Sequence, residues 1–201
     1  MPGPFAHPPR CTAANALLDQ LRRHHRPTAD HCVRVAHVLM SVWASEPRTV
    51  GDPEPLLIGG AMHDIGKLFV PVTTLDSEHA LSATEREMIR MHPYAGAEVL
   101  RSLGFPPVIV AAARDHHERW NGGGYPRGCN GEEVHPIARL TAVADAYVAM
   151  VEPGRRYRAP LSHEAALAEI RSCRGTQFDP QAADRLLHAL SDRSCIPVVL
   201  A

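Results

Sequence analysis

Apolar residues recur at intervals of three and four along most of the chain, which is the period of one face of an α-helix. Runs that alternate apolar and polar residues, as half-buried strands do, are few. The periodic segments predict helices over residues 15–24, 28–45, 55–63, 82–103, 107–119, 135–150, 162–171 and 180–190. We therefore expect an all-α fold in a single domain.

Residues at the ends of several segments mark where helices begin or break. Ser82-Ala-Thr-Glu85 has the spacing of a capping box. Pro93 falls inside the same periodic segment, so a bend or break is expected there. Asp179 followed by Pro180 supplies the N-cap and first-turn residues of the last helix.

The size and charge of the chain narrow the range of functions. Its 201 residues suffice for one domain with a sizeable core, and its formal net charge is −1. No whole-chain attraction to polymeric nucleic acid or to an anionic membrane surface is therefore expected. No apolar run reaches the length of a transmembrane helix, and Met1–Arg10 lacks the apolar stretch of a signal peptide, so we expect a flexible tail there.

The five cysteines are scattered along the chain and form no C-x-x-C pair. This distribution argues against a disulfide framework and against a structural zinc site. It fits the reducing environment of the cytoplasm, where we expect the protein to be found.

Histidine is the compositional outlier, with 13 residues, and the pair His63-Asp64 is the most informative place where it occurs. A neutral imidazole beside a carboxylate suits a divalent metal ion of borderline character. A carboxylate has two oxygens and can bridge two ions, which an imidazole cannot do. Taken alone, the pair is more simply explained as two polar residues at a helix end.

Two further features point to the same chemistry. His116 and His117 are adjacent near the end of a predicted helix, where the helix dipole favours a cation, although alone they would be explained as a solvated pair. Asp145 lies in an apolar helix, where a carboxylate is costly unless it is paired, hydrogen-bonded or metal-bound. An N-cap or a salt-bridged core residue is the alternative there. His31 and His92, on other predicted helices, are candidates to face the same centre.

Four short motifs follow one another along the chain: His63-Asp64-Ile-Gly-Lys67, His92-Pro93, His116-His117-Glu118 and Gly124-Tyr125-Pro126. In this order they resemble the HD-GYP subfamily of the HD phosphohydrolase superfamily. The resemblance implies an all-helical HD-type domain with a GYP loop that hydrolyses cyclic di-GMP at a centre of two or three metal ions. It divides the chain into an N-terminal tail with a short helix (1–27), the HD-GYP domain (28–190) and a C-terminal tail (191–201).

The resemblance also implies roles for individual residues. One metal ion would be held by His31, His63, Asp64 and Asp145, and the other by Asp64, His92, His116 and His117. Iron or manganese is expected, with zinc, cobalt and nickel as alternatives. Two ions lower the pKa of a bridging water and give a hydroxide nucleophile near neutral pH. Asp64 and Lys67 would be catalytic, with Lys67 at the scissile phosphate and assisting the leaving group. The residues that would bind the substrate are Tyr125, Pro126, Arg155 and Arg158.

Some positions depart from the family pattern. Members with a third metal ion have a glutamate where this chain has Pro27, so we expect two ions and a reaction that stops at linear pGpG rather than GMP. Arg156 stands where the family has a proline, and the segment 151–154 is one residue longer than usual. The substrate contacts are therefore less well determined than the metal ligands.

The leading interpretation is a metal-dependent cyclic di-GMP phosphodiesterase. One alternative is a broader HD phosphohydrolase acting on other cyclic dinucleotides or on nucleotides. Another is a non-catalytic module that binds cyclic di-GMP or docks diguanylate cyclases. The complete ligand set together with Lys67 favours the enzyme. A regulatory protein, a diguanylate cyclase or a second copy of the chain are the protein partners that the resemblance allows.

Overall fold

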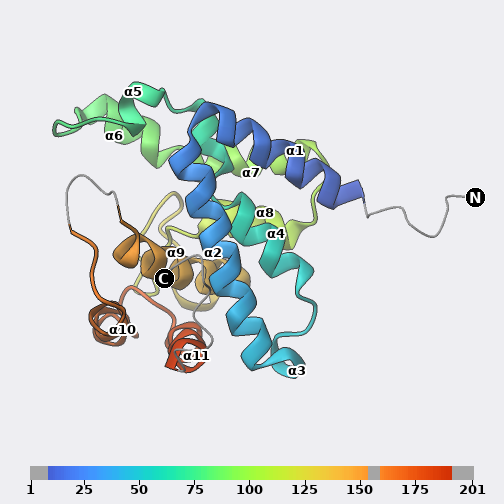
Figure 1. The fold of residues 1–201 in the computed structure, drawn as a ribbon, viewed down its shortest axis with the longest axis vertical. Coiled ribbons are helices and arrows are strands. Elements are labelled where there is room, and N and C mark those ends of the chain that lie inside the picture. Colours follow the sequence, from blue (N-terminus) through green and yellow to red (C-terminus); the bar gives the residue numbers. More distant parts are fainter. Residues whose placement is uncertain (1–8, 154–158, 192–201) are drawn as a thin grey trace, which may run out of the picture.

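A long central helix, α2 (Arg26–Ser45), crosses the molecule and contacts α1, α4, α9 and α11 (Figure 1). The computed structural model describes residues 9–153 and 159–191, and within these ranges it contains helices and no strand, which confirms the predicted all-α fold. The other elements are α1 (Pro9–His24), α3 (Pro47–Val50), α4 (Glu54–Met62), the 3-10 helix η1 (Ile65–Phe69), α5 (Val72–Leu75), α6 (Ala83–Arg90), α7 (His92–Ser102), α8 (Pro107–Asp115), the 3-10 helix η2 (Gly131–Glu133), α9 (Pro136–Val151), α10 (His163–Ser172) and α11 (Pro180–Ser191).

The predicted helix signals at residues 82–103 act as expected. Glu85 N donates to Ser82 Oγ at 3.2 Å, and Ser82 N donates to the Glu85 carboxylate at 2.8 Å, which completes the capping box. The segment breaks before Pro93, because α6 ends at Arg90 and α7 begins at His92.

Two helices differ in length from the prediction. Helix α1 begins at Pro9 rather than residue 15, in keeping with the preference of proline for a first helical turn. Helix α8 ends at Asp115 rather than residue 119. Beyond it the chain leaves the helix because Trp120 N and Asn121 N donate to the carbonyls of Gln177 and Thr176, at 3.0 and 2.9 Å. These partners come from a distant turn and leave no local sequence signal.

Two apolar clusters form the core. One joins the second half of α2 to α9, α10 and α11, and the other joins α1, η1, α7 and the start of α2. Helices α2, α4 and α8 contribute side chains to both clusters. These three helices are therefore held from both sides, which makes them a rigid base for any site between the clusters.

Gly66 in η1 lets two segments approach closely. A Cβ at this position would clash with the backbone carbonyl of His92 and lie 2.6 Å from the backbone nitrogen of Gly96. The absence of a side chain therefore allows η1 to pack directly on the first turn of α7. This contact sets His63-Asp64 beside His92.

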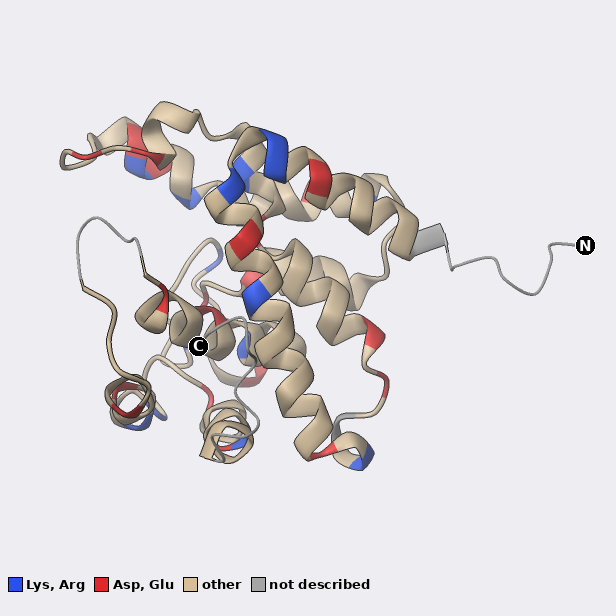
Figure 2. Ribbon diagram, in the orientation of Figure 1, with Lys and Arg blue, Asp and Glu red and all other residues tan. Residues whose placement is uncertain are grey.

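Charged residues of both signs are interspersed over the described helices (Figure 2). This pattern agrees with the formal net charge of −1. No helix among the described residues is long and apolar enough to cross a membrane.

We expect Gly66→Ala to lower the free energy of unfolding by about 2–3 kcal/mol, because the added methyl overpacks backbone against backbone. Gly123→Ala is a matched control, since a Cβ there would meet only the Asn121 side chain at 3.3 Å and Arg119 Cδ at 3.9 Å. Urea denaturation measures both changes. Equal stabilities of the two variants would contradict this account of Gly66.

Candidate metal centre

Seven imidazole and carboxylate side chains meet in the interior where the central helices converge. His31 comes from α2, His92 is the first residue of α7, and Asp145 lies on α9. His63 and His116 are the residues that directly follow α4 and α8, and Asp64 and His117 follow them. All seven predicted ligands are therefore brought together, although they span 115 positions of the sequence, from 31 to 145.

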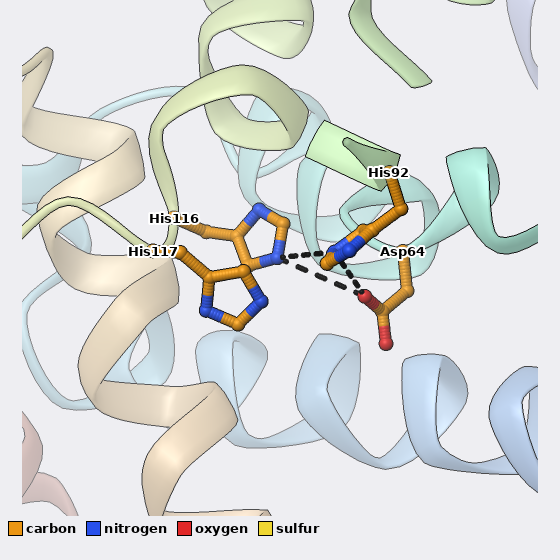
Figure 3. A group of neighbouring side chains, drawn as sticks. All are labelled: Asp64, His92, His116 and His117. Atoms are coloured by element: carbon orange, nitrogen blue, oxygen red, sulfur yellow. Dashed lines mark hydrogen bonds and ion pairs between the residues drawn. The ribbon is translucent and has the colours of Figure 1, made fainter. Parts of the chain in front are cut away.

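The first group contains Asp64, His92, His116 and His117, whose candidate ligand atoms lie within 4.8 Å of one another (Figure 3). His92 Nε2 is 3.0 Å from Asp64 Oδ1 and 3.3 Å from His116 Nε2. His116 Nε2 is 3.7 Å from the same Asp64 oxygen. These four residues match one of the two expected ligand sets.

The second group contains His31, His63, Asp64 and Asp145, and His63 is its member nearest the other oxygen of Asp64. His63 Nε2 lies 3.5 Å from Asp64 Oδ2 and 3.9 Å from Asp145 Oδ1. Asp145 Oδ1 lies 2.8 Å from His31 Nε2. The candidate ligand atoms of His31, His63 and Asp64 also lie within 4.8 Å of one another. Asp64 thus faces one histidine group with each of its oxygens, as a bridging carboxylate would.

Three histidines share one backbone arrangement that orients their rings. The Nδ1 atoms of His63, His92 and His116 lie 2.7, 2.5 and 2.9 Å from the carbonyl oxygen three residues earlier in each case. Because a carbonyl oxygen only accepts, each Nδ1 carries the proton and donates it. Each Nε2 then keeps its lone pair and points it into the centre.

His31 is oriented by side chains instead. Its Nδ1 lies 3.0 Å from the Glu152 carboxylate, which also accepts a hydrogen bond from Arg34. Burial disfavours the charged imidazole, but the bonds to Asp145 and Glu152 outweigh it and raise the pKa of His31 to about 9. A metal ion at His31 Nε2, the nitrogen that faces Asp145, would have to displace the proton shared with that carboxylate.

The protonation states of the other groups suit metal binding. Burial lowers the pKa of His92 to about 4 and, with His116 nearby, lowers the pKa of His117 well below its usual value. Burial works to raise the pKa of Asp64, but Lys67 and His63 outweigh it and hold that pKa well below its usual value. Burial likewise opposes ionisation of Asp145, and its bond to His31 keeps the pKa low. Neutral imidazoles and ionised carboxylates are the forms that bind metals.

The residues of the first group fit a cation because the lone pairs of Asp64 Oδ1, His92 Nε2 and His116 Nε2 converge with no proton between them. His92 Nε2 and His116 Nε2 face Asp64 Oδ1, and both protons of these rings are on Nδ1. Asp64 Oδ1 and His63 Nε2 are buried and have no hydrogen-bond partner among the described residues. Buried polar atoms without a partner are rare and costly. A divalent ion in each group would satisfy them.

Lys67 lies beside this centre on η1. Its Nζ donates to Asp64 Oδ2 at 2.6 Å. Burial works to lower the pKa of Lys67, but the Asp64 charge outweighs it and raises that pKa, so the ammonium form persists at neutral pH.

The GYP loop packs on the turn that carries the histidine pair. Tyr125 N donates to His117 O at 3.2 Å, and the Tyr125 ring stacks on the His117 ring with centroids 4.7 Å apart. A Cβ on Gly124 would lie 2.5 Å from Glu118 Cα and from His117 O, so only glycine allows this approach. The glycine at position 124 therefore lets this loop pack directly on the backbone of residues 117–119.

Two cavities flank the centre. One of about 340 Å³ is lined by His116, His117, Tyr125 and Asp145, together with Arg90. The other, of about 430 Å³, is lined by His31, Asp64, Lys67, Asp76 and Glu152, among others.

Of the four expected substrate residues, Tyr125 is the one that the structure places in a cavity next to the centre. Pro126 follows Tyr125 and is not among the residues that line either of these cavities. Arg155 and Arg158 lie outside the described residues.

Sequence reasoning missed several supporting residues. Glu152 contacts His31 across 121 positions, and no local pattern marks it. Glu118, part of the quoted motif, accepts from Arg127 N at 2.7 Å and so ties the GYP loop to the histidine turn. Asp115 is fully buried and accepts from both Arg114 and Arg127. In the sequence, only the position of Asp115 next to His116 could have indicated that it supports the site.

Comparison with known proteins agrees with this geometry. Residues 47–182 match the sequence model of the family described as HD domain. A probable cyclic di-GMP phosphodiesterase of Vibrio cholerae is 33% identical over 188 residues, which cover 86% of this chain and 42% of that protein. A 3'3'-cGAMP-specific phosphodiesterase of the same organism is 31% identical over 179 residues, covering 87% of this chain and 33% of the relative. A cyclic di-GMP phosphodiesterase response regulator of Xanthomonas campestris is 38% identical over 128 residues, covering 63% of this chain and 34% of the relative.

The chain spans less than half the length of these curated relatives. Among solved structures, a cyclic GMP-AMP specific phosphodiesterase of Vibrio cholerae superposes with a TM-score of 0.69 at 20% identity, covering 94% of this chain and 50% of that one. This likeness concerns the fold. From the family match and the relatives, the chain belongs to the HD domain family and is of the HD-GYP type.

Proposed function

We propose that this chain is a metal-dependent phosphodiesterase that hydrolyses cyclic di-GMP to linear pGpG. The observation that carries the proposal is the Asp64 carboxylate, which turns one oxygen to His92 and His116 and the other to His63. Two ions sharing one carboxylate are the arrangement used for in-line displacement at phosphorus. The names of the relatives supply the substrate class.

We propose two ligand sets that share Asp64. His31, His63, Asp64 and Asp145 would hold one ion, and Asp64, His92, His116 and His117 the other. Divalent ions there would supply Lewis acidity, both to activate water and to stabilise charge on the phosphoryl oxygens. Mixed imidazole and carboxylate ligands suit iron and manganese, and also zinc, cobalt or nickel.

Lys67 is the residue of this chain placed to help the leaving group. It is the only lysine in the sequence, while every other basic position except the histidines is arginine. Its ammonium group sits on Asp64 and lines the larger cavity, so it can turn from that carboxylate to a substrate phosphate. We propose that Nζ contacts the scissile phosphate and donates to the departing oxygen.

A second candidate is a phosphodiesterase for 3'3'-cGAMP. The observation in its favour is the 31% identity, over 87% of this chain, to a relative named for that substrate. The two cyclic dinucleotides differ in one purine, so the metal centre would treat them alike. Discrimination would come from the cavity walls.

We expect protein loaded with Mn(II) or Fe(II) to turn over cyclic di-GMP to pGpG and to prefer it over 3'3'-cGAMP. Chromatography of the products measures both the preference and the end point. Because Pro27 stands in place of a third-ion ligand, accumulation of pGpG without GMP is expected. A preference for 3'3'-cGAMP would favour the second candidate, and no turnover with metals bound would leave a binding role.

Asp64→Ala should remove the bridge and with it both bound ions. Loss of a residue that only hydrogen-bonds to a metal ligand lowers activity by roughly 10- to 100-fold. Because Asp64 would itself be a ligand, the rate of hydrolysis should fall by more than this. Metal content by mass spectrometry and turnover are measured together. Asp19→Ala, at an exposed carboxylate of α1, is the matched control and should keep both. Asp64→Ala protein with two ions and normal turnover would refute the bridging role.

Lys67→Ala should keep the metals and lower kcat by about 100- to 1000-fold, because a donor at the developing charge is lost. Lys67→Arg keeps the positive charge but cannot give up a proton, so it should not recover kcat. If Lys67→Ala instead loses metal, the lysine holds Asp64 in place and has no role in the chemical step.

A further inference from the structure

Arg90, the last residue of α6, is exposed and lines the smaller cavity. Its guanidinium carbon lies 4.5 Å from the centroid of the Tyr125 ring, within cation–π distance. Tyr125 in turn stacks on His117, a candidate metal ligand. Arg90, Tyr125 and His117 therefore form one continuous stack that leads from the protein surface to the metal centre.

The hydrogen-bond donors of Arg90 are free of protein acceptors among the described residues, which sets it apart from its neighbours. Arg119, which lines the same cavity, donates to Gln177 at 2.5 Å. Arg86, one turn earlier on α6, donates to the Leu81 carbonyl. Arg127 donates to Asp115 at 3.1 Å. The Tyr125 ring thus orients the Arg90 side chain, and the guanidinium N–H groups remain available to bind a ligand.

The two cavities differ in charge. The larger one carries the carboxylates of Asp64, Asp76 and Glu152 beside Lys67. The smaller one carries Arg90 and Arg119 beside Tyr125, and its carboxylates are the ligand Asp145 and the buried Glu118. Beyond the metal centre itself, an anionic group is therefore favoured in the smaller cavity.

We propose that Arg90 binds the second, uncleaved phosphate of the cyclic dinucleotide, with Tyr125 holding the guanidinium in place. This inference rests on the proposed function, since a cyclic dinucleotide has two phosphodiesters and only one is cleaved at a time. With one phosphate at the metal centre, the other lies away from the ions, and a chain of formal net charge −1 attracts it only through a local cation such as Arg90.

The experiment compares two substrates on the metal-loaded protein. Cyclic di-GMP has two phosphates, whereas bis(4-nitrophenyl) phosphate has one and needs only the metal centre. For Arg90→Ala, the ratio of kcat/KM for cyclic di-GMP to kcat/KM for the simple diester should fall about 10- to 100-fold, mostly through KM, as for a lost charge-assisted hydrogen bond. Arg90→Lys, which keeps the charge, should recover part of the loss.

Arg86→Ala is the matched control, because this arginine lies on the same helix and outside both cavities. It should leave the ratio unchanged. The rise of KM with added salt should also be smaller in Arg90→Ala than in the wild type, since a charge contact is missing.

An unchanged ratio in Arg90→Ala would overturn the inference. An equal loss on both substrates would also overturn it, because Arg90 would then act by supporting Tyr125 and the metal ligands. Wild-type protein that cleaves the simple diester but no cyclic dinucleotide would refute the proposed function and this inference with it. A wild-type enzyme active on both substrates with an unaffected variant refutes the inference alone.

Discussion

The constraint on which much of this structure depends is the convergence of three lone pairs, those of Asp64 Oδ1, His92 Nε2 and His116 Nε2. None of these three atoms carries a proton, so they cannot hydrogen-bond to one another. Mutual repulsion of this kind in a buried place disfavours folding unless a cation is present. The two apolar clusters provide the opposing force, since α2, α4 and α8 belong to both and cannot move apart without exposing apolar surface. The cores hold the ligands together, and the bound ions would relieve the strain.

The helices were largely predictable because periodicity and caps are local signals. The Ser82 capping box and the break before Pro93 are examples in which residues within one turn decide the outcome. The early end of α8 was not predictable, because Trp120 and Asn121 are drawn out of the helix by carbonyls of the 176–177 turn. Long-range backbone pairing of this kind overrides a continuing helical pattern.

The site was predictable to the extent that its residues carry their own chemistry. The pairs His63-Asp64 and His116-His117, and a carboxylate at Asp145 in an apolar helix, are unusual wherever they occur, and the structure gathers them. The supporting residues carry no such mark. Glu152 is an ordinary glutamate until the fold sets it against His31. Nothing in the sequence distinguishes Arg90 from the other arginines, because its contact with the Tyr125 ring arises only in the fold. Contacts between residues that are far apart in the sequence cannot be predicted from the spacing of residues along the chain.

The single lysine shows how much the centre constrains its surroundings. The chain uses arginine at all other non-histidine basic positions, including Arg114, which pairs with the buried Asp115. A guanidinium at position 67 would be planar, would match the Asp64 carboxylate with two parallel bonds and would not release a proton at any attainable pH. It would compete with metal for both oxygens of the bridge. An ammonium group is a point donor that occupies one oxygen, at 2.6 Å, and can leave it. On the proposed function, lysine at this position would keep the Asp64 bridge available for metal and retain a transferable proton beside the substrate.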